Sequence, residues 1–528
     1  MWKYCSFYCN QDVTILRTAF NRFCKGFIRD FKINPLNFVS ISSLANEVFN
    51  QRVYYPNGKL YKVGGHVRKF MSQAIYGGRC MCALNKKWKV KGPISDYDAV
   101  SLYPSAMSRL YTVEGKPTVI DVPPNWTNLT EIPSELNNAS AYIIDIKITK
   151  VDKHYPFPLI VQKTTEGLNL NDDTGIDESH PVCMTVDNIY LEDLVEFQHI
   201  TFDIIRGYKW MGKRDYRIQN EIRRIFNMHL RYKAEGNPLE QLYKLIMNSC
   251  YGKTIQRPID KGYKYKLAGE ELDKYWQNNY NSIIEDIEIP NSSIHALRVM
   301  KPIDSHFNFS LLGIQVLSMS KRIMNEVMCL ASDLGCRIYY QDTDSMHIMT
   351  EDLPKLEEAF KQKYGRELRG KNLGQFHSDF PTINGHNEVP ISTDSIFLMK
   401  KMYIDKLTDS TGDIDYMIRG KGLTQNSISA VYNKHYNGDP MKLYEDLYNG
   451  NEVTFDLTEG QPCFKMNKNL TVSTLMEFKR KIKTTYSEGS DTAAGHNAAS
   501  ASSAARTCGA ADSSNDPVDS CVVSADSI

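Results

Sequence analysis

The sequence lacks the features that mark membrane-spanning, secreted and disulfide-stabilised proteins. Its 528 residues contain no run of about 18 or more apolar residues, which argues against a transmembrane helix. The first residues, MWKYCSFYCNQDV, show no basic segment followed by an apolar core, so we expect no secretory signal. The twelve cysteines form no C-x-x-C pair, which favours free thiols over a zinc site or a disulfide framework. These absences predict an intracellular protein, in the cytoplasm, nucleus or an organelle, that is not secreted and has no membrane partner.

A strong net charge is also absent, because 63 Lys and Arg balance 62 Asp and Glu to leave a net charge of +1. The total therefore gives no argument for or against nucleic acid as a partner. The distribution is more informative, since residues 206–257 carry twelve Lys and Arg against four Asp and Glu, and residues 462–483 carry six against one. Two basic segments on a neutral chain favour local contact with a polyanion, and solvated helix faces are the alternative interpretation.

Large apolar side chains are almost absent from residues 487–528, which are rich in Ser, Ala, Asp and Gly. Such a segment cannot bury enough surface to offset the entropy of ordering, so we predict a disordered tail. The rest of the chain has the composition of an ordinary globular protein, with 42% hydrophobic and 24% charged residues.

Segments with helical periodicity alternate with strand-like segments, which predicts a mixed α/β (α+β) chain. The basic region is the clearest helical part, and Gly236 and Pro238 interrupt it, so we expect an antiparallel pair of helices there. The other expected elements are a helix at 310–333, strands at 140–149 and 336–349, and a hairpin at 400–418.

Two short acidic segments raise a question of electrostatics. Asp342 and Asp344 lie two residues apart in YYQDTDSMHI, which has the composition of a β-strand, so we expect both carboxylates on one face and Thr343 on the other. Asp98 lies in SDYDAVSLYPSAM, where Pro104 disfavours helix at the preceding residue and the backbone must turn. Like charges repel and each carboxylate costs free energy to desolvate, so a compensating partner is expected.

The order of these segments is more specific than either alone. Asp98-x-x-S-L-Y-P, then Lys244-x-x-x-N-S-x-Y-G, then Y-x-Asp342-T-D-S resemble motifs A, B and C of the B-family DNA polymerases. Tyr76-Gly-Gly-Arg resembles the Y-x-G-G linker element of that family, and Lys401-Met-Tyr resembles its K-x-Y motif. The sequences of the segments SLYPS, IMNSCYGK and YGGRC are most similar to those of the protein-primed branch of phages, adenoviruses, linear plasmids and transposons. The resemblance covers roughly residues 1–486.

The resemblance implies a DNA-directed DNA polymerase that uses two Mg²⁺ ions, with Mn²⁺ as a substitute. Phosphoryl transfer needs charge neutralisation more than covalent help, and hard cations prefer carboxylate oxygens. The metal ligands and catalytic residues implied by the resemblance are Asp98, the carbonyl of Ala99, Asp342 and Asp344. Primer–template DNA and deoxynucleoside triphosphates are the implied partners, together with a terminal (priming) protein.

The resemblance also implies residues that bind the incoming nucleotide and the primer. Lys244, Asn248 and Tyr251 fall on one face of a helix. The resemblance places Tyr103 under the sugar of the incoming nucleotide, where a ribose 2′-hydroxyl would collide with its ring. The full set of implied nucleotide-binding residues is Ser101, Leu102, Tyr103, Arg231, Lys244, Asn248 and Tyr251. The implied primer and DNA contacts are Tyr76, Gly77, Gly78, Lys401 and Tyr403.

The domain organisation implied by the resemblance is a right-hand polymerase with a remnant of an RNase H-like exonuclease domain. Tyr8-x-x-x-Asp12 resembles the third exonuclease motif, but no counterpart of the first two precedes Asp98, so we expect no 3′–5′ proofreading. The expected ranges are 1–75 for the exonuclease remnant, 76–205 for the linker and first palm part with a priming-protein contact in 115–200, 206–257 for the fingers, 258–303 for an insertion, 304–400 for the second palm part, 401–486 for the thumb and 487–528 for the tail.

Two other functions were weighed against polymerisation on DNA. Reverse transcription is disfavoured because those enzymes carry adjacent aspartates in the last motif, where this chain has Thr343 between them. A catalytically inactive, DNA-binding remnant of a mobile element or virus stays the alternative, favoured by the incomplete exonuclease motifs and the low-complexity tail. Against it, all three polymerase motifs are intact.

Overall fold

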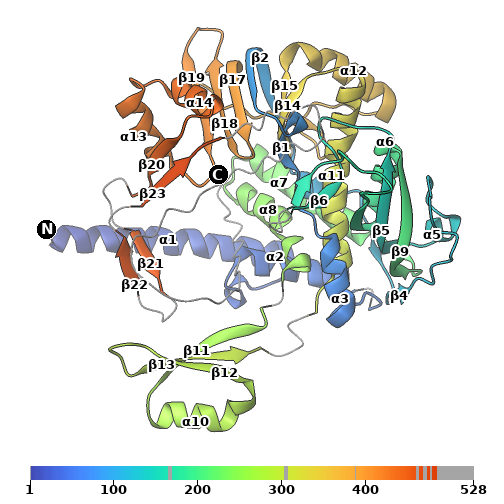
Figure 1. Cartoon of the computed structure of the whole chain (residues 1–528). Coiled ribbons are helices and arrows are strands. Elements are labelled where there is room, and N and C mark those ends of the chain that lie inside the picture. The colour runs from blue at the N-terminus through green and yellow to red at the C-terminus, as the bar shows by residue number, and fades with distance from the viewer. Residues whose placement is uncertain are drawn as a thin grey trace, which may run out of the picture.

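The computed structural model describes residues 2–484 except for 57, 165–168, 258, 302–306, 387, 459–462, 468–471 and 476–477. The predicted tail, 487–528, lies outside the described residues. The mixed helix and strand composition that the sequence predicts is confirmed (Figure 1). In this part of the chain no helix combines the length and the apolar character needed to cross a bilayer. The nine cysteines whose side chains are described are free thiols, as predicted.

An antiparallel sheet of eight strands forms the centre of the fold. Seven strands follow the order β1-β14-β15-β2-β17-β18-β19, and β16 pairs with β2 beyond the end of β17. The strands are β1 (Cys80–Cys82), β2 (Trp88–Ala99), β14 (Ile338–Asp342), β15 (Ser345–Met349), β16 (Phe376–Ser378), β17 (Ile391–Met399), β18 (Met402–Thr408) and β19 (Ile414–Gly420). Because β2 borders three partners, Asp98 at its end lies where segments far apart in sequence converge.

The predicted hairpin at 400–418 is confirmed as β18–β19, but it belongs to the central sheet. The domain boundary expected at residue 401 therefore falls inside the sheet. A separate layer begins only after Gly420, where α13 (Gln425–His435), α14 (Pro440–Tyr448), β20 (Val453–Asp456) and β23 (Lys479–Ile482) share an apolar cluster with β17 and β18. The sequence could not show this, because hairpin pairing is local whereas membership of a sheet depends on distant strands.

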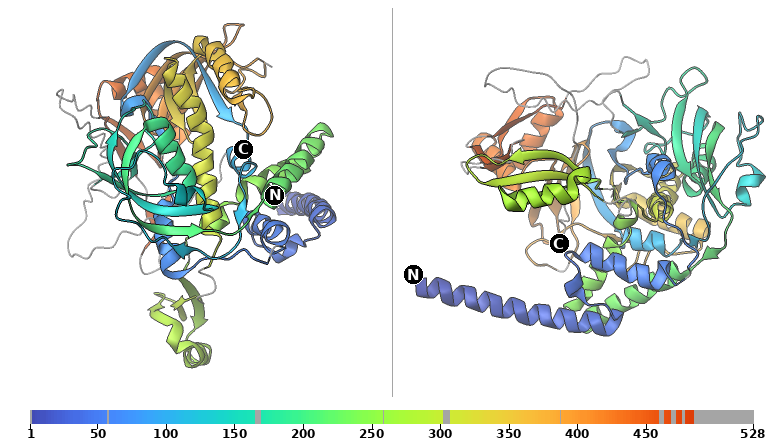
Figure 2. Two further views of the ribbon diagram at one scale, coloured as in Figure 1. Left: turned by 90° about the vertical axis from the view of Figure 1, so that its right-hand side faces the viewer. Right: turned by 90° about the horizontal axis from the view of Figure 1, so that it is seen from below.

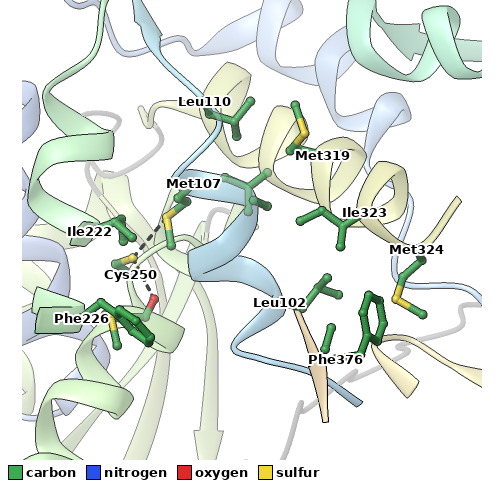
Figure 3. Packing of buried hydrophobic residues seen from close by; sticks show 14 of the residues in the cluster. Leu102, Met107, Leu110, Ile222, Phe226, Cys250, Met319, Ile323, Met324 and Phe376 are labelled. Atoms are coloured by element: carbon green, nitrogen blue, oxygen red, sulfur yellow. Dashed lines mark hydrogen bonds between the residues drawn. The ribbon is translucent and has the colours of Figure 1, made fainter. Parts of the chain in front are cut away.

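Three helices pack around the end of β2 that carries Asp98. The predicted helix is confirmed as α11 (Ser310–Asp333), which packs on the short α4 (Leu102–Met107) and on α6 (Asn188–Gln198). Figure 3 shows Leu102 of α4 near Phe376 and Ile323 of α11, and Met107 near Cys250. The Cys250 thiol contacts the Met107 sulfur at 3.6 Å. This apolar packing holds the turn after Asp98 between α11 and the helical pair described next.

The predicted antiparallel helix pair is confirmed as α7 (Arg217–Ala234) and α8 (Leu239–Ser249). Its apolar face is buried through Ile218, Ile222, Ile225 and Phe226, the side chains that the periodicity selects. The helices α2 (Ile41–Phe49) and α9 (Gly252–Ile255) pack beside it, and α12 (Leu353–Tyr364) covers the far end of α11.

The N-terminal helix α1 (Trp2–Phe31) is exposed over most of its length and extends away from the rest of the molecule (Figure 2, right). Its last turn is docked on the helix pair through Asp30. That carboxylate accepts hydrogen bonds from the hydroxyls of Tyr232, at 3.0 Å, and Tyr243. Arg29 pairs with the same carboxylate at 2.7 Å.

Replacing Asp30 with asparagine should destabilise the protein by about 1–3 kcal/mol at neutral pH, the usual range for hydrogen bonds to a charged group. Burial alone would raise the pKa of Asp30, but hydrogen bonds from Arg29, Tyr243 and Tyr232 outweigh it and lower the pKa to about 2. A lowered native pKa stabilises the fold above the unfolded value near 4 and loses that effect as the pH falls toward 2. Thermal unfolding from pH 7 to 2 should therefore show Asp30→Asn converging with wild type in acid. Asp12→Asn, on the exposed part of α1, is the control and should unfold like wild type throughout.

A second sheet lies on the side of the molecule near α6. Its order is β4 (Thr118–Val119), β9 (Ile200–Trp210), β5 (Ala141–Val151) and β8 (Val182–Asp187), so the strand predicted at 140–149 is confirmed. It has its own apolar core, which includes Ile144, Ile146 and Phe202. Smaller elements complete this half: α3 (Gly65–Met71), α5 (Ser134–Asn137), β3 (Thr112–Val113), β6 (Val161–Lys163), β7 (Asn169–Asn171) and β10 (Arg214–Asp215).

Within the region expected as an insertion, 258–303, residues 261–300 form a small separate layer at the bottom of Figure 1. Three strands in the order β11 (Lys261–Leu267), β13 (Ile294–Met300) and β12 (Ile283–Glu288) pack on α10 (Glu270–Asn279). Leu272, Leu297 and Val299 make its own small core. The remaining hairpin is β21 (Cys463–Met466) with β22 (Val472–Leu475).

Candidate active site

The segment with Asp342 and Asp344 is a hairpin turn, so the prediction of one continuous strand is wrong. The strand β14 ends at Asp342, β15 begins at Ser345, and these two residues pair with each other. Thr343 has φ +56° and the Asp344 N–H donates to the Asp342 carbonyl at 2.6 Å. A left-handed conformation costs a non-glycine residue about 1–2 kcal/mol, so threonine gave no sequence signal for a turn.

The turn is held from outside by the Tyr76–Arg79 segment. The Thr343 N–H donates to the Arg79 carbonyl at 2.8 Å. Gly78 lies so close to the turn that a Cβ there would be 2.5 Å from the Thr343 methyl carbon. Gly77, next to it, is exposed and its added Cβ would meet nothing within 4 Å. The absence of a side chain at residue 78 therefore lets this segment support the turn.

Asp98, near the end of β2, and Asp344, in the turn before β15, come together. Ser345 is the register partner of Asp98, and the Ala99 N–H donates to the Asp344 carbonyl at 2.8 Å. Burial and then the charges of Asp344 and Asp379 raise the pKa of Asp98, against the opposing charge of Lys244. Burial and the charges of Asp342 and Asp379 raise the pKa of Asp344. Several carboxyl groups thus share one site, where a bound cation would favour their ionised forms.

Two further residues join Asp98 that sequence reasoning missed. The strand β16 places His377 opposite Asp98, and one ligand atom from each of Asp98, His377 and Asp379 lies within 4.8 Å of the other two. The spacing of His377 and Asp379 was the available signal, because residues two apart share one face of an extended segment. The strand β16 has only three residues, which is too short to show the alternation of apolar and polar residues by which a strand is predicted.

Asp342 and Lys401 meet at the rim of the site. The Lys401 Nζ lies 3.6 Å from an Asp342 carboxylate oxygen, and the Lys401 N–H donates to the Tyr340 hydroxyl at 2.8 Å. Lys401, Thr343 and Ser101 all have positive φ, at +59°, +56° and +47°. A positive φ costs a non-glycine residue conformational free energy, and three such residues lie around this one site. Contacts with the surrounding structure must offset that cost.

The aromatic residues predicted to meet the nucleotide also come together. Tyr103 of α4 and Tyr251, which follows α8, stack with ring centroids 4.2 Å apart and planes 26° apart. Burial is the main cause that raises the pKa of both phenols. Ser101 caps α4 and its carbonyl accepts from the Ser105 N–H at 2.9 Å, while Leu102 is buried. On α8, Lys244 is exposed and Asn248 is half-buried.

Other predicted site residues lie elsewhere. Arg231, at the end of α7, is exposed and pairs with Glu235 at 3.5 Å, and none of its described contacts reaches Asp98 or Asp344. Tyr8 and Asp12 lie on the exposed half of α1.

The two tyrosines predicted to contact DNA are core residues, so those predictions are corrected. Tyr76 is 7% exposed and its hydroxyl accepts a hydrogen bond from the Thr185 N–H at 3.3 Å. Tyr403 is 5% exposed and packs between Tyr340 and Phe397. Both were assigned from short motifs, and a motif does not show which face of a strand or linker is covered.

Comparison with known proteins gives three kinds of similarity. Residues 1–308 match the family described as DNA polymerase type B, organellar and viral. A probable DNA polymerase of Ascobolus immersus is 26% identical over 352 residues, which are 65% of this chain but only 26% of that protein. The fold is similar to Phi29 DNA polymerase complexed with primer–template DNA and incoming nucleotides, with a TM-score of 0.57 and 17% identity over 84% of this chain and 68% of that one. The binary complex of Phi29 DNA polymerase with primer–template DNA gives a TM-score of 0.57 at 16% identity, over 84% of this chain and 67% of that one.

Proposed function

The chain belongs to the type B DNA polymerases of organelles and viruses, and we propose that it is itself a DNA-directed DNA polymerase that extends a primer 3′-hydroxyl with deoxynucleotides. The observation that carries the proposal is the meeting of Asp98, at the end of β2, with Asp344, in the turn before β15, where burial and neighbouring carboxylates raise the pKa of both groups. Lys244 approaches the same pair from the helix pair, and the Tyr103–Tyr251 stack borders it. Acidic, cationic and aromatic groups thus surround one site, as nucleotide transfer requires.

The side chains present fit divalent cations. They offer hard carboxylate oxygens in a partly buried, negatively charged place, which is the donor chemistry that Mg²⁺ selects. We propose two Mg²⁺ ions, with Mn²⁺ as a substitute, held by Asp98, the Ala99 carbonyl, Asp342 and Asp344. When bound, the ions supply the charge neutralisation that phosphoryl transfer needs. Asp379 adds negative charge next to Asp98, and His377 and Asp379 extend the proposed donor set.

Other side chains and backbone groups of the protein are proposed to bind the nucleotide and the primer. Lys244 offers a cation to the triphosphate, and Asn248 lies one turn further along the same face of α8. The backbone at Ser101 is left-handed at the start of α4, and we propose that the N–H groups of Ser101 and Leu102 meet the phosphate oxygens. Lys401 and Gly77 lie near the Asp342 turn, where we place the primer. Arg231 would reach the nucleotide only if α7 moved toward the site.

The partners that we propose are primer–template DNA, deoxynucleoside triphosphates and a priming protein. Support for the DNA comes from family membership and from the basic strand β23, where Lys479, Arg480 and Lys481 are in sequence. The four-stranded sheet that occupies much of 115–200 is our candidate contact for the priming protein. We also propose that the chain does not proofread. Asp12 lies on the exposed half of α1, and among the described residues it belongs to no cluster of three or more close acidic, histidine or cysteine side chains.

The test is extension of a labelled primer on a template by purified protein with Mg²⁺ and all four deoxynucleotides. Template-directed products, absent with Asp344→Ala, would support the proposal. Folded protein that binds the primer–template but extends nothing would contradict it and favour an inactive DNA-binding remnant.

Replacing Tyr103 with valine should admit ribonucleotides. Removing the ring opens the space where a 2′-hydroxyl would lie, and steric discrimination of this size changes selectivity by about 10- to 200-fold. The measurement is the ratio of kcat/KM for a deoxynucleotide and the matching ribonucleotide. Tyr103→Phe keeps the ring and should retain wild-type selectivity. Equal ratios in Tyr103→Val and wild type would contradict the assignment.

A further inference from the structure

A histidine held between two carboxylates is completely buried next to the proposed active site. His347 has one ring nitrogen, Nε2, 3.2 Å from an Asp405 oxygen and the other, Nδ1, 3.5 Å from an Asp96 oxygen. The exposed fractions of Asp96, His347 and Asp405 are 2%, 0% and 0%. A cluster of three ionisable groups with no access to water is costly to form, so its position in the fold needs an explanation.

Each member of the cluster lies on a strand that carries, or begins next to, a proposed site residue. Asp96 precedes Asp98 by two residues on β2, and its register partner on β15 is His347, which follows Asp344 by three residues. Asp405 lies on β18, which begins just after Lys401. The order of the sheet places β2 and β17 between β15 and β18. The contact from His347 to Asp405 therefore joins strands that are not neighbours, across the curved face of the sheet.

One hydroxyl and four aromatic rings surround the cluster, and Arg419 and Asp379 act on Asp96 through their charges. The Ser395 hydroxyl donates to the second Asp405 oxygen at 2.6 Å. Four aromatic rings pack edge-on around the imidazole, from Tyr340, Phe380, Phe397 and Tyr403. The imidazole thus lies between the two carboxylates inside an apolar shell, with a hydrogen bond at Nε2 to Asp405 and a longer contact at Nδ1 to Asp96.

From this geometry we propose that Asp96, His347 and Asp405 are positioning residues that hold β2, β15 and β18 in one register and so set the position of Asp98 relative to Asp344. Buried ion pairs add little net stability compared with apolar side chains of the same size, but they select one arrangement, because any slip leaves a charge unpaired. A sheet whose function depends on two carboxylates from separate strands gains most from such a constraint. The inference rests on the proposed function.

The test compares variants of this cluster with a matched buried ion pair elsewhere. His347→Gln and Asp405→Asn remove one charge each, and Ser395→Ala, which deletes one neutral hydrogen bond, is the mildest variant. The control is Asp193→Asn, because Asp193 is 1% exposed and pairs with Arg322 at 2.5 Å on α6 and α11. Three quantities are measured on each full-length protein below its unfolding temperature: Mn²⁺ affinity by electron paramagnetic resonance, kcat for primer extension, and the Kd for primer–template.

We expect the cluster variants to lose about 10- to 100-fold in Mn²⁺ affinity and in kcat, the range for groups that orient metal ligands, at an unchanged Kd for primer–template. Ser395→Ala should also lower the Mn²⁺ affinity and kcat, but by less than His347→Gln or Asp405→Asn. Asp193→Asn should lose thermal stability while keeping wild-type Mn²⁺ affinity and kcat. Cluster variants that behave like Asp193→Asn would overturn the positioning role. Wild-type protein that neither binds Mn²⁺ nor extends the primer would instead contradict the proposed function itself.

Discussion

Replacing Asp344 with alanine should reduce kcat/KM for primer extension by about 10³- to 10⁴-fold, since metal-assisted charge stabilisation contributes several kcal/mol to the transition state. The half-buried Asp344 carboxylate lies beside Asp98, and its loss would remove one of the proposed metal ligands. Asp98→Ala should have a similar effect. The double variant should be little worse than either single one, because the two residues act as a unit.

The measurement is single-turnover extension by one nucleotide, with primer–template affinity determined in parallel. Glu351→Ala is the matched control, because Glu351 is an exposed carboxylate just beyond the other end of β15, paired with Arg337. It should extend primers at the wild-type rate. An Asp344→Ala protein that keeps more than about a tenth of wild-type activity, a loss under 1.4 kcal/mol, would exclude Asp344 as a metal ligand in the reaction.

Replacing Gly78 with alanine should lower kcat by about 10²-fold, although the residue carries no chemistry. The added Cβ would lie 2.5 Å from the Thr343 methyl carbon and 2.8 Å from its hydroxyl oxygen, so the turn between Asp342 and Asp344 must shift. A displacement of about 1 Å at reacting groups is enough for a loss of this size. The primer-extension rate and the Mg²⁺ concentration for half-maximal activity measure the effect, and both should worsen.

Two matched variants separate this mechanism from a general loss of folding. Gly77→Ala adds the same methyl group one residue earlier, where it meets no protein atom within 4 Å, and should keep the wild-type kcat at saturating primer–template. Gly78→Ala combined with Thr343→Gly removes the atoms that clash, and glycine adopts the φ of +56° without strain, so activity should recover. Equal losses in Gly77→Ala and Gly78→Ala would show that the linker, not the turn, is what the substitution disturbs.

Local sequence pattern predicted the elements whose periodicity is long. The helix pair, the helix at 310–333, the strand at 140–149 and the hairpin at 400–418 are all present. It failed at the turn of Asp342–Asp344, because aromatic and β-branched neighbours favour a strand and the left-handed Thr343 is set by a contact with Arg79. It also assigned Tyr76 and Tyr403 to the DNA, since a tyrosine in a motif looks the same whether its ring is buried or exposed.

The sequence by itself determined which motifs the chain contains and their order along it. That order was enough to indicate the polymerase family. Three motifs select Asp98, Lys244 and Asp344 as candidate site residues, because charge, hydrogen bonding and helical spacing are properties of short segments. Only the tertiary structure decided what surrounds them. His377 and Asp379 next to Asp98, Gly78 under the turn and His347 between Asp96 and Asp405 all depend on strands that pair across many residues of chain. Such pairings are chosen by the packing of the whole sheet, and no local segment encodes them.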